Sequence, residues 1–142
     1  MANRTPMQPT TSDAVARRMI DRASVEARSL GVPVTIVVVD GSGVLKAMQR
    51  IDSAPLVSVQ TAINKAYAAA AIGMPPDDFY AAIESDAAAV AEFATRPGLA
   101  LIAGGLPVVV DSRVAGAIGV AGAMTGAQDR RIAEIAVAHV TA

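Results

Sequence analysis

A small set of charged side chains in the middle of the chain is the first place to look for chemistry. Arg50 and Asp52 are two residues apart on a segment predicted to be extended, so their side chains point to the same face. Lys65 lies within a helix predicted over residues 55–72, and no other charged residue occurs between Asp52 and Asp77. A cation among alanine, valine and isoleucine must extend to solvent, pair with an acid or contact a ligand.

These side chains suit a site for an organic anion. In an enzyme acting on a small organic acid, Arg50 and Lys65 would hold a carboxylate, and Asp52 or Asp129 would be the general base. Gln128 and Asp129 open another predicted helix, where backbone amides and the positive end of the helix dipole attract anions.

Each of these groups also has a structural interpretation. Arg50 and Asp52 could form a surface ion pair of little energetic weight, and Lys65 could extend to solvent from the side of its helix. Gln128 matches the last position of a capping box, with Asp129 as a favourable first-turn acid, and we favour this interpretation. If Lys65 is buried, Asp52 and Asp129 are the candidate partners of its ammonium.

The absence of cysteine and the single histidine exclude several classes of site. The chain has no cysteine and one histidine, His139, close to the C-terminus. Disulfides, thiolate metal sites, histidine-centred triads and multi-histidine metal sites are therefore excluded within one chain, and no metal site is predicted. His139 could ligate a haem iron, but it is near a helix end that frays, and we favour no ligand role. Tyr67 is two residues after Lys65 and points away from it on a helix.

Charge and hydropathy indicate which partners to expect. The formal net charge is −1 with acids and bases interspersed, so there is no basic stripe for nucleic acid. No apolar run approaches membrane-spanning length, and the first ten residues are polar, which favours a cytoplasmic protein without membrane contacts. Hydrophobic residues make up 53% of the 142 residues, and this high fraction predicts buried interfaces between subunits.

The apolar periodicity and the turns predict the elements that position these groups. Residues 1–10 are predicted as a flexible arm and residues 11–142 as a single domain. Helices are predicted from Thr10 or Thr11 to Leu30, at 55–72, 77–85 and 87–95, and from the cap Thr125 to about Val140. Strands are predicted at 34–39, 44–52, 99–102, 106–110 and 114–120. Tight turns join most strands, so we expect an α+β fold with a five-stranded antiparallel sheet and packed helices.

The last predicted strand has one face without a large side chain. That face carries Ala115, Ala117, Gly119 and Ala121. It allows the close approach of another backbone or of a flat ligand, and we favour a helix packed tightly on it.

A series of short motifs runs in a fixed order along almost the whole chain. They are Val37-Val38-Val39-Asp40-x-x-Gly43-x-Leu45, Arg50-x-Asp52-x-Ala54, Ser58, Lys65-Ala66, Gly104-Gly105-Leu106-Pro107, Gly116-Ala117-Ile118-Gly119-Val120 and Gln128-Asp129. Together they resemble the GlcG/HbpS family of haem-binding or haem-degrading proteins.

This resemblance implies a profilin-like α-β-α sandwich around a five-stranded antiparallel sheet. It also implies homo-oligomers, based on dimers and in some cases octameric, and haem as the candidate cofactor. The recurring polar set of the family falls on Arg50, Asp52, Lys65, Gln128 and Asp129, beside the Gly104-Gly105 turn. With no cysteine and only a terminal histidine, this chain lacks an obvious strong axial ligand; tyrosine or a weak oxygen ligand is an option that stays open.

Three functions are consistent with the sequence. The first is a small-ligand-binding protein of the haem-binding type, tied to small-molecule catabolism, with its ligand near the small-residue strand face. The second is a cofactor-independent isomerase, lyase or hydrolase that acts on a small organic acid. The third is an oligomeric scaffold or regulator without a small ligand. The catalytic candidates are Lys65, Asp52 and Asp129, and the ligand-binding candidates are Arg50, Lys65, Gly104, Gly105 and Gln128.

Overall fold

The four strands of the structure form one antiparallel sheet in the order β2-β1-β4-β3. The computed structural model describes residues 4–141; residues 1–3 of the predicted arm, and Ala142, lie outside the described residues. The strands are β1 (Thr35–Asp40), β2 (Leu45–Arg50), β3 (Gly105–Val110) and β4 (Arg113–Ala121). β1 and β4 are central, which agrees with the β-branched, wholly buried run predicted for β1.

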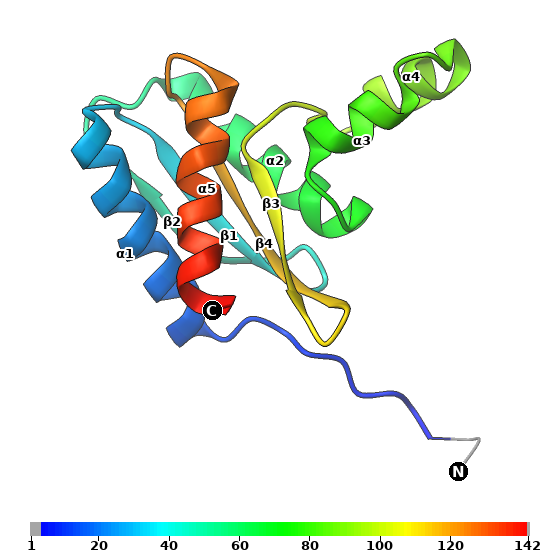
Figure 1. The fold of residues 1–142 in the computed structure, drawn as a ribbon, viewed down its shortest axis with the longest axis horizontal. Coiled ribbons are helices and arrows are strands. Elements are labelled where there is room, and N and C mark those ends of the chain that lie inside the picture. The colour runs from blue at the N-terminus through cyan, green and yellow to red at the C-terminus, as the bar shows by residue number, and fades with distance from the viewer. Residues whose placement is uncertain (1–3, 142) are drawn as a thin grey trace.

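Helices cover both faces of this sheet (Figure 1). α1 (Asp13–Leu30) and α5 (Gly126–Thr141) pack against each other and on one face, and α2 (Leu56–Ile72) packs on the other. α3 (Pro76–Ile83) and α4 (Ala87–Ala94) form an arm that projects from the body of the molecule (Figure 1). The expected antiparallel sheet with packed helices is confirmed.

The prediction of a fifth strand at residues 99–102 was wrong. These residues follow a turn in which the Leu99 N–H donates to the Arg96 carbonyl oxygen at 3.3 Å, and they join no strand of the described sheet. The sheet ends instead at β3, which contains Pro107. Proline has no N–H to donate to a ladder and is typical of edge strands, so β3 is suited to be the last strand.

The small-residue face of β4 lies directly under α2. Ala117 and Ala121 pack with Ala62, Ala66 and other residues in one of the two core clusters. A Cβ added at Gly119 would lie 2.6 Å from the Ala66 amide nitrogen, so only glycine allows the helix this close. The prediction of a helix packed tightly on this face is therefore confirmed, and α2 leaves no room there for a flat ligand.

The start of α1 differs from the predicted cap at Thr10 or Thr11. Ser12 is the N-cap, and its side chain accepts a hydrogen bond from the Val15 N–H at 3.1 Å. Thr11 is buried and donates its hydroxyl to the Ala115 carbonyl oxygen at 2.9 Å. Thr11 therefore joins the chain before α1 to β4, a contact that its position in the sequence does not reveal.

Candidate functional site

Lys65 and Asp129 form a buried ion pair between α2 and α5. Lys65 Nζ lies 3.0 Å from Asp129 Oδ2, and the two residues are 3% and 4% exposed. Lys65 lies on α2 above β4, and Asp129 lies in the first turn of α5. Of the two acids considered as partners of Lys65, the structure brings Asp129 into contact with it.

Backbone groups complete the hydrogen bonds of this pair. Lys65 Nζ also donates to the Val120 carbonyl oxygen at 3.0 Å, and the Ala123 N–H donates to Asp129 Oδ1 at 3.0 Å. Burial raises the pKa of the Asp129 carboxyl, while the Lys65 ammonium and the Ala123 N–H act in the opposite direction. The pair thus joins α2, the end of β4 and the start of α5.

The turn at Gly104 and Gly105 packs against the lysine. A Cβ added at Gly104 would lie 2.8 Å from Lys65 Nζ, and one added at Gly105 would collide with the Lys65 carbonyl oxygen. The structure therefore brings Gly104, Gly105, Lys65 and Asp129 together in a tightly packed, buried cluster. None of them lines the hollows described below.

Arg50 and Asp52 do not join this cluster. Arg50 ends β2, and its Nε and Nη2 donate to the Ala54 carbonyl oxygen at 3.0 and 2.7 Å. Asp52 is exposed in the following turn. No hydrogen bond or ion pair among the described residues connects either side chain with Lys65 or Asp129.

Gln128 makes only part of the predicted capping box. Its N–H donates to Thr125 Oγ1 at 3.2 Å, as expected for the start of α5. Its side-chain oxygen Oε1 is buried and has no hydrogen-bond partner among the described residues. The reciprocal bond from the cap is thus not made by this oxygen.

A ligand-sized groove lies on the other side of α2 from the buried pair. We call it the Tyr67 groove; it consists of two hollows of about 320 and 370 Å³ that share Tyr67 and Pro97. The larger hollow is lined by Val39, Gly43, Leu45, Ile63, Asn64, Tyr67, Pro97 and Gly98. The smaller hollow is lined by Tyr67, Ala71, Ile72, Phe79, Phe93, Arg96, Pro97 and Leu99. Both volumes fall in the range typical of small-molecule sites.

Two glycine turns hold the Tyr67 ring in place. A Cβ added at Gly43 would lie 3.2 Å from Tyr67 Cδ1, and one added at Gly98 would lie 3.7 Å from Cδ2 on the opposite edge. Both glycines have left-handed backbone angles, with φ of +80° and +77°. Tyr67 is 42% exposed, and its phenol oxygen makes no hydrogen bond to any part of the chain that the structure describes. The sequence does not reveal this groove, and its one signal is that Tyr67 is the single aromatic residue of an alanine-rich helix.

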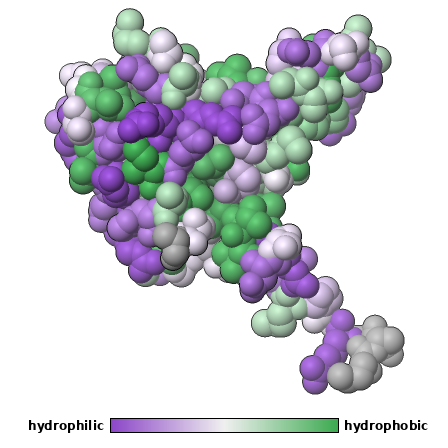
Figure 2. Space-filling model, viewed as in Figure 1, coloured by the Kyte–Doolittle hydropathy of each residue, from purple (hydrophilic) through white to green (hydrophobic). Residues whose placement is uncertain are grey.

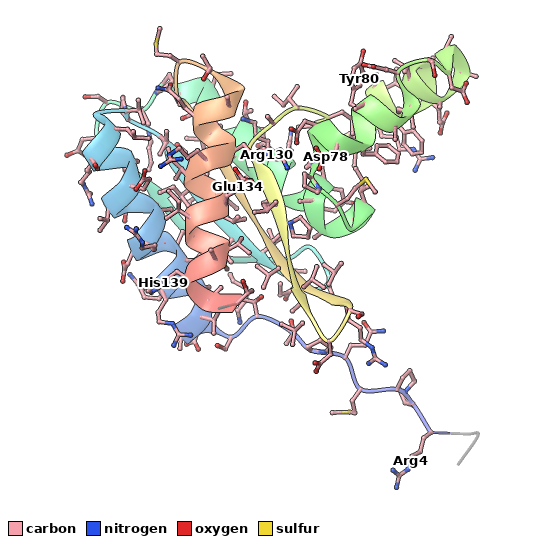
Figure 3. The ribbon with its side chains drawn as sticks, in the orientation of Figure 1. Arg4, Asp78, Tyr80, Arg130, Glu134 and His139 are labelled. Carbon is pink, nitrogen blue, oxygen red and sulfur yellow. The ribbon has the colours of Figure 1, made fainter. Side chains whose placement is uncertain are left out.

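His139 does not line this groove. It is near the end of α5 (Figure 3) and lines a separate hollow with Arg18, Asp21, Arg22 and Val25. Three of these four neighbours are charged, so the hollow is a poor site for a large apolar ligand. Among residues 4–141, no three His, Cys, Asp or Glu side chains are grouped so as to hold a metal ion.

A second charged cluster fixes the base of the projecting arm to α5. Arg130 Nη1 lies 2.8 Å from Asp77 Oδ2 and 2.7 Å from Asp78 Oδ1, and its Nε lies 3.7 Å from Glu134 Oε2 (Figure 3). Hydrogen bonds to Asp78 and Asp77 raise the pKa of the Arg130 guanidinium above its ordinary value. Arg130 follows Asp129 in the chain, so one turn of α5 carries both interhelical connections.

An antiparallel sheet covered by helices on both faces, with an apolar groove beside one helix, defines a small α+β sandwich domain. The chain belongs to the HbpS-like family: the model of this family, described as haem degrading protein HbpS-like, matches residues 12–138. The resemblance found in the sequence is therefore confirmed.

Individual proteins support the same assignment. A relative from Citrobacter freundii, an uncharacterized 15.0 kDa protein in the dhaT-dhaS intergenic region, is 32% identical over 136 residues, which are 95% of each chain. The crystal structure of Klebsiella pneumoniae protein ORFY superposes with a TM-score of 0.90 at 27% identity, covering 99% of this chain and 97% of that one.

A further solved structure carries haem. The crystal structure of the PduOC:heme complex superposes with a TM-score of 0.84 at 26% identity, and covers 93% of this chain and 96% of that one. Haem has thus been found on a protein with this fold.

None of the described helices is long and apolar enough to cross a membrane.

Proposed function

We propose that this protein binds a flat, largely apolar ligand of the haem type in the Tyr67 groove. The observation that carries this proposal is the groove itself, whose two hollows meet at an aromatic ring and are lined mostly by apolar side chains. Membership of the HbpS-like family and the haem complex of a structural relative support the choice of ligand.

The residues of the groove fit such a ligand. Val39, Leu45 and Ile63 supply apolar contacts for a ring system in the larger hollow. Arg96 lines the smaller hollow with its guanidinium 4.8 Å from the centre of the Phe93 ring. The same guanidinium pairs with Glu92 Oε1 at 2.9 Å, and because both side chains are exposed this ion pair is weak. Arg96 is therefore suited to exchange it for the carboxylates that haem carries. Bound haem would supply a redox-active iron.

The enzymatic alternative has less support from the geometry. It requires charged groups that converge on a space open to substrate. Lys65 and Asp129 are instead paired with each other and buried, and Arg50 and Asp52 lie apart from them. We therefore propose that Lys65, Asp129, Gly104 and Gly105 stabilise the fold; a link to small-molecule catabolism and a cytoplasmic location stay predictions from the sequence.

A pair of matched variants tests the location of the ligand. Leu45 lines the Tyr67 groove and Val25 lines the hollow of His139, and both side chains are about half exposed, so glutamate is tolerated at either position. Hemin is titrated and the Soret band is followed. We expect Leu45→Glu to weaken binding about tenfold or more, because it places a carboxylate against an apolar ligand.

The control variants should leave binding unchanged. Val25→Glu and His139→Ala alter the hollow that is lined by His139, the one histidine of the chain. If Val25→Glu or His139→Ala abolishes the Soret band while Leu45→Glu keeps it, the proposed location is wrong. If hemin does not bind to the wild-type protein, the proposed function is wrong.

We also propose that the protein is a homo-oligomer. β2 is an edge strand with an exposed outer side, and Leu56 and Val57 at the start of α2 are 78% and 72% exposed. Exposed apolar side chains beside an open strand edge favour association with another chain. The high apolar fraction of the sequence supports the same proposal.

A further inference from the structure

We propose that Tyr67 is the side chain that ligates the iron of the bound haem-type ligand. This inference rests on the proposed function and adds the residue that holds the metal. Side chains able to ligate haem iron are mainly histidine, cysteine, methionine and tyrosine. Among the residues that line the two hollows of the Tyr67 groove, Tyr67 alone belongs to this set.

The position of Tyr67 suits this role. It lines both hollows of the groove and also a third hollow beside Gly41, Ser42 and Ala70, so its ring stands where three surface hollows meet. The phenol oxygen has no hydrogen-bond partner among residues 4–141, and the residue is 42% exposed. The oxygen is thus free to bind a metal without breaking an existing contact.

The surroundings of the ring provide preorganisation. The turns at Gly43 and Gly98 lie at opposite edges of the ring. A Cβ added at either glycine would lie within 4 Å of a ring carbon. Both turns belong to segments that also line the larger hollow, so the ring and the apolar wall form one unit. An iron-ligating side chain that neighbouring residues already hold in place loses less conformational entropy when the haem binds.

The coordination step balances without an oxidant or reductant. The phenol O–H gives its proton to solvent, and the phenolate oxygen donates an electron pair to ferric iron. One water bound to the ferric iron would leave to solvent as the phenolate oxygen takes its place, and the iron would stay ferric. Because one proton is released, binding of ferric haem through Tyr67 weakens as the pH falls.

Resonance Raman spectroscopy of the ferric haem complex tests this proposal. We expect phenolate vibrations in the wild-type complex that disappear in Tyr67→Phe, together with an affinity for hemin about tenfold lower or more. Tyr80 is the matched control, because it is the other tyrosine of the chain, is similarly exposed at 40%, and lines neither hollow of the groove. The Tyr80→Phe variant should keep both the spectrum and the affinity.

Metal-free protoporphyrin IX separates this inference from the proposed function. It should bind wild type and Tyr67→Phe with nearly equal affinity, because the apolar walls remain and no iron is present. If hemin binds the wild-type protein without phenolate vibrations, Tyr67 is not the iron ligand. The proposed binding in the Tyr67 groove is then decided separately, by the Leu45→Glu variant. If neither porphyrin binds the wild-type protein, the proposed function fails and this inference fails with it.

Discussion

Lys65 shows how the surroundings of a residue determine its role. The ammonium has two protein acceptors at 3.0 Å, Asp129 Oδ2 and the Val120 carbonyl oxygen. Removing one partner of a buried ion pair leaves an uncompensated charge, which costs more than the net stabilisation by the pair. The strength of this pair is therefore best measured by comparing single and double substitutions.

We expect Lys65→Met to lower the free energy of unfolding by about 3–5 kcal/mol, because Asp129 would stay buried without its cation. The double variant Lys65→Met/Asp129→Asn should regain most of this loss, since asparagine still accepts the Ala123 hydrogen bond and carries no charge. Urea denaturation of both proteins gives the two values. A loss below about 1 kcal/mol for Lys65→Met would show that the ammonium is not held as the structure places it.

The candidate site was only partly predictable from the sequence, for a reason of geometry. Lys65 stood out as a lone cation on an apolar helix, and the need for a partner followed from desolvation. Asp52 and Asp129 were equal candidates for this partner, because the order of residues along the chain does not show which acid folds next to Lys65. The role of Tyr67 did not follow from the sequence, because its groove is assembled from β1, β2 and the turn between them, from α2, α3 and α4, and from the loop after α4.

At the scale of elements, the least supported part of the fold is the arm formed by α3 and α4. No residue of α4 is buried, and Pro76 is the only buried residue of α3. An edge-to-face contact between Phe79 and Phe93 joins the two helices, and Figure 2 shows the arm as a lobe separated from the body. Arg130 is the charged connection from this arm to α5.

We expect Arg130→Met to speed amide hydrogen exchange across residues 76–94, because it removes both ion pairs at the base of α3. Global stability should change by about 1 kcal/mol or less, since the cluster is partly exposed. Arg131→Met is the matched control on the same helix, as Arg131 pairs with Glu26 of α1 at 3.6 Å. Exchange in the arm that is equally slow in both variants would contradict this role of Arg130.

The boundaries of elements were predicted well where one residue type has a strong backbone preference. Gly31 and Gly73 end α1 and α2 with left-handed φ angles, at the predicted positions. The fifth strand failed because an apolar run of four residues does not specify a pairing partner, and β3 with Pro107 is already the edge. Ser12 replaced Thr11 as the cap because Thr11 bonds to β4, which is a long-range contact.

At the scale of the whole molecule, the open edge at β2 is the feature most relevant to assembly. β2 is paired only with β1, and most of its residues are exposed. Leu56 and Val57 follow shortly after this strand and are the two most exposed large apolar residues of α2. A second copy that covers this region would bury apolar surface that a monomer leaves in water.

Light scattering after size exclusion should give a mass that is a multiple of 14.4 kDa at micromolar concentration. Leu56→Lys combined with Val57→Lys should shift the mass towards the monomer, because two charges would enter the interface. Val25→Lys, an exposed apolar position on α1, should leave the mass unchanged. A single species at the monomer mass for the wild-type protein would refute the proposed assembly.

The Tyr67 groove and the buried ion pair share the helix α2. α2 separates the buried pair at Lys65 from the groove at Tyr67, so a ligand can bind on one side of the helix without disturbing the pair on the other. A measurement that locates the ligand on the surface of the protein is therefore the most direct test.

Paramagnetic broadening of methyl NMR signals provides this measurement. Ferric haem broadens signals from nearby methyl groups, and gallium protoporphyrin serves as the diamagnetic control. We expect hemin to broaden the methyl signals of Val39, Leu45, Ile63 and Leu99, which line the groove, and to leave those of Val25 unchanged. Broadening at Val25 with sharp signals from the groove residues would contradict binding in the Tyr67 groove.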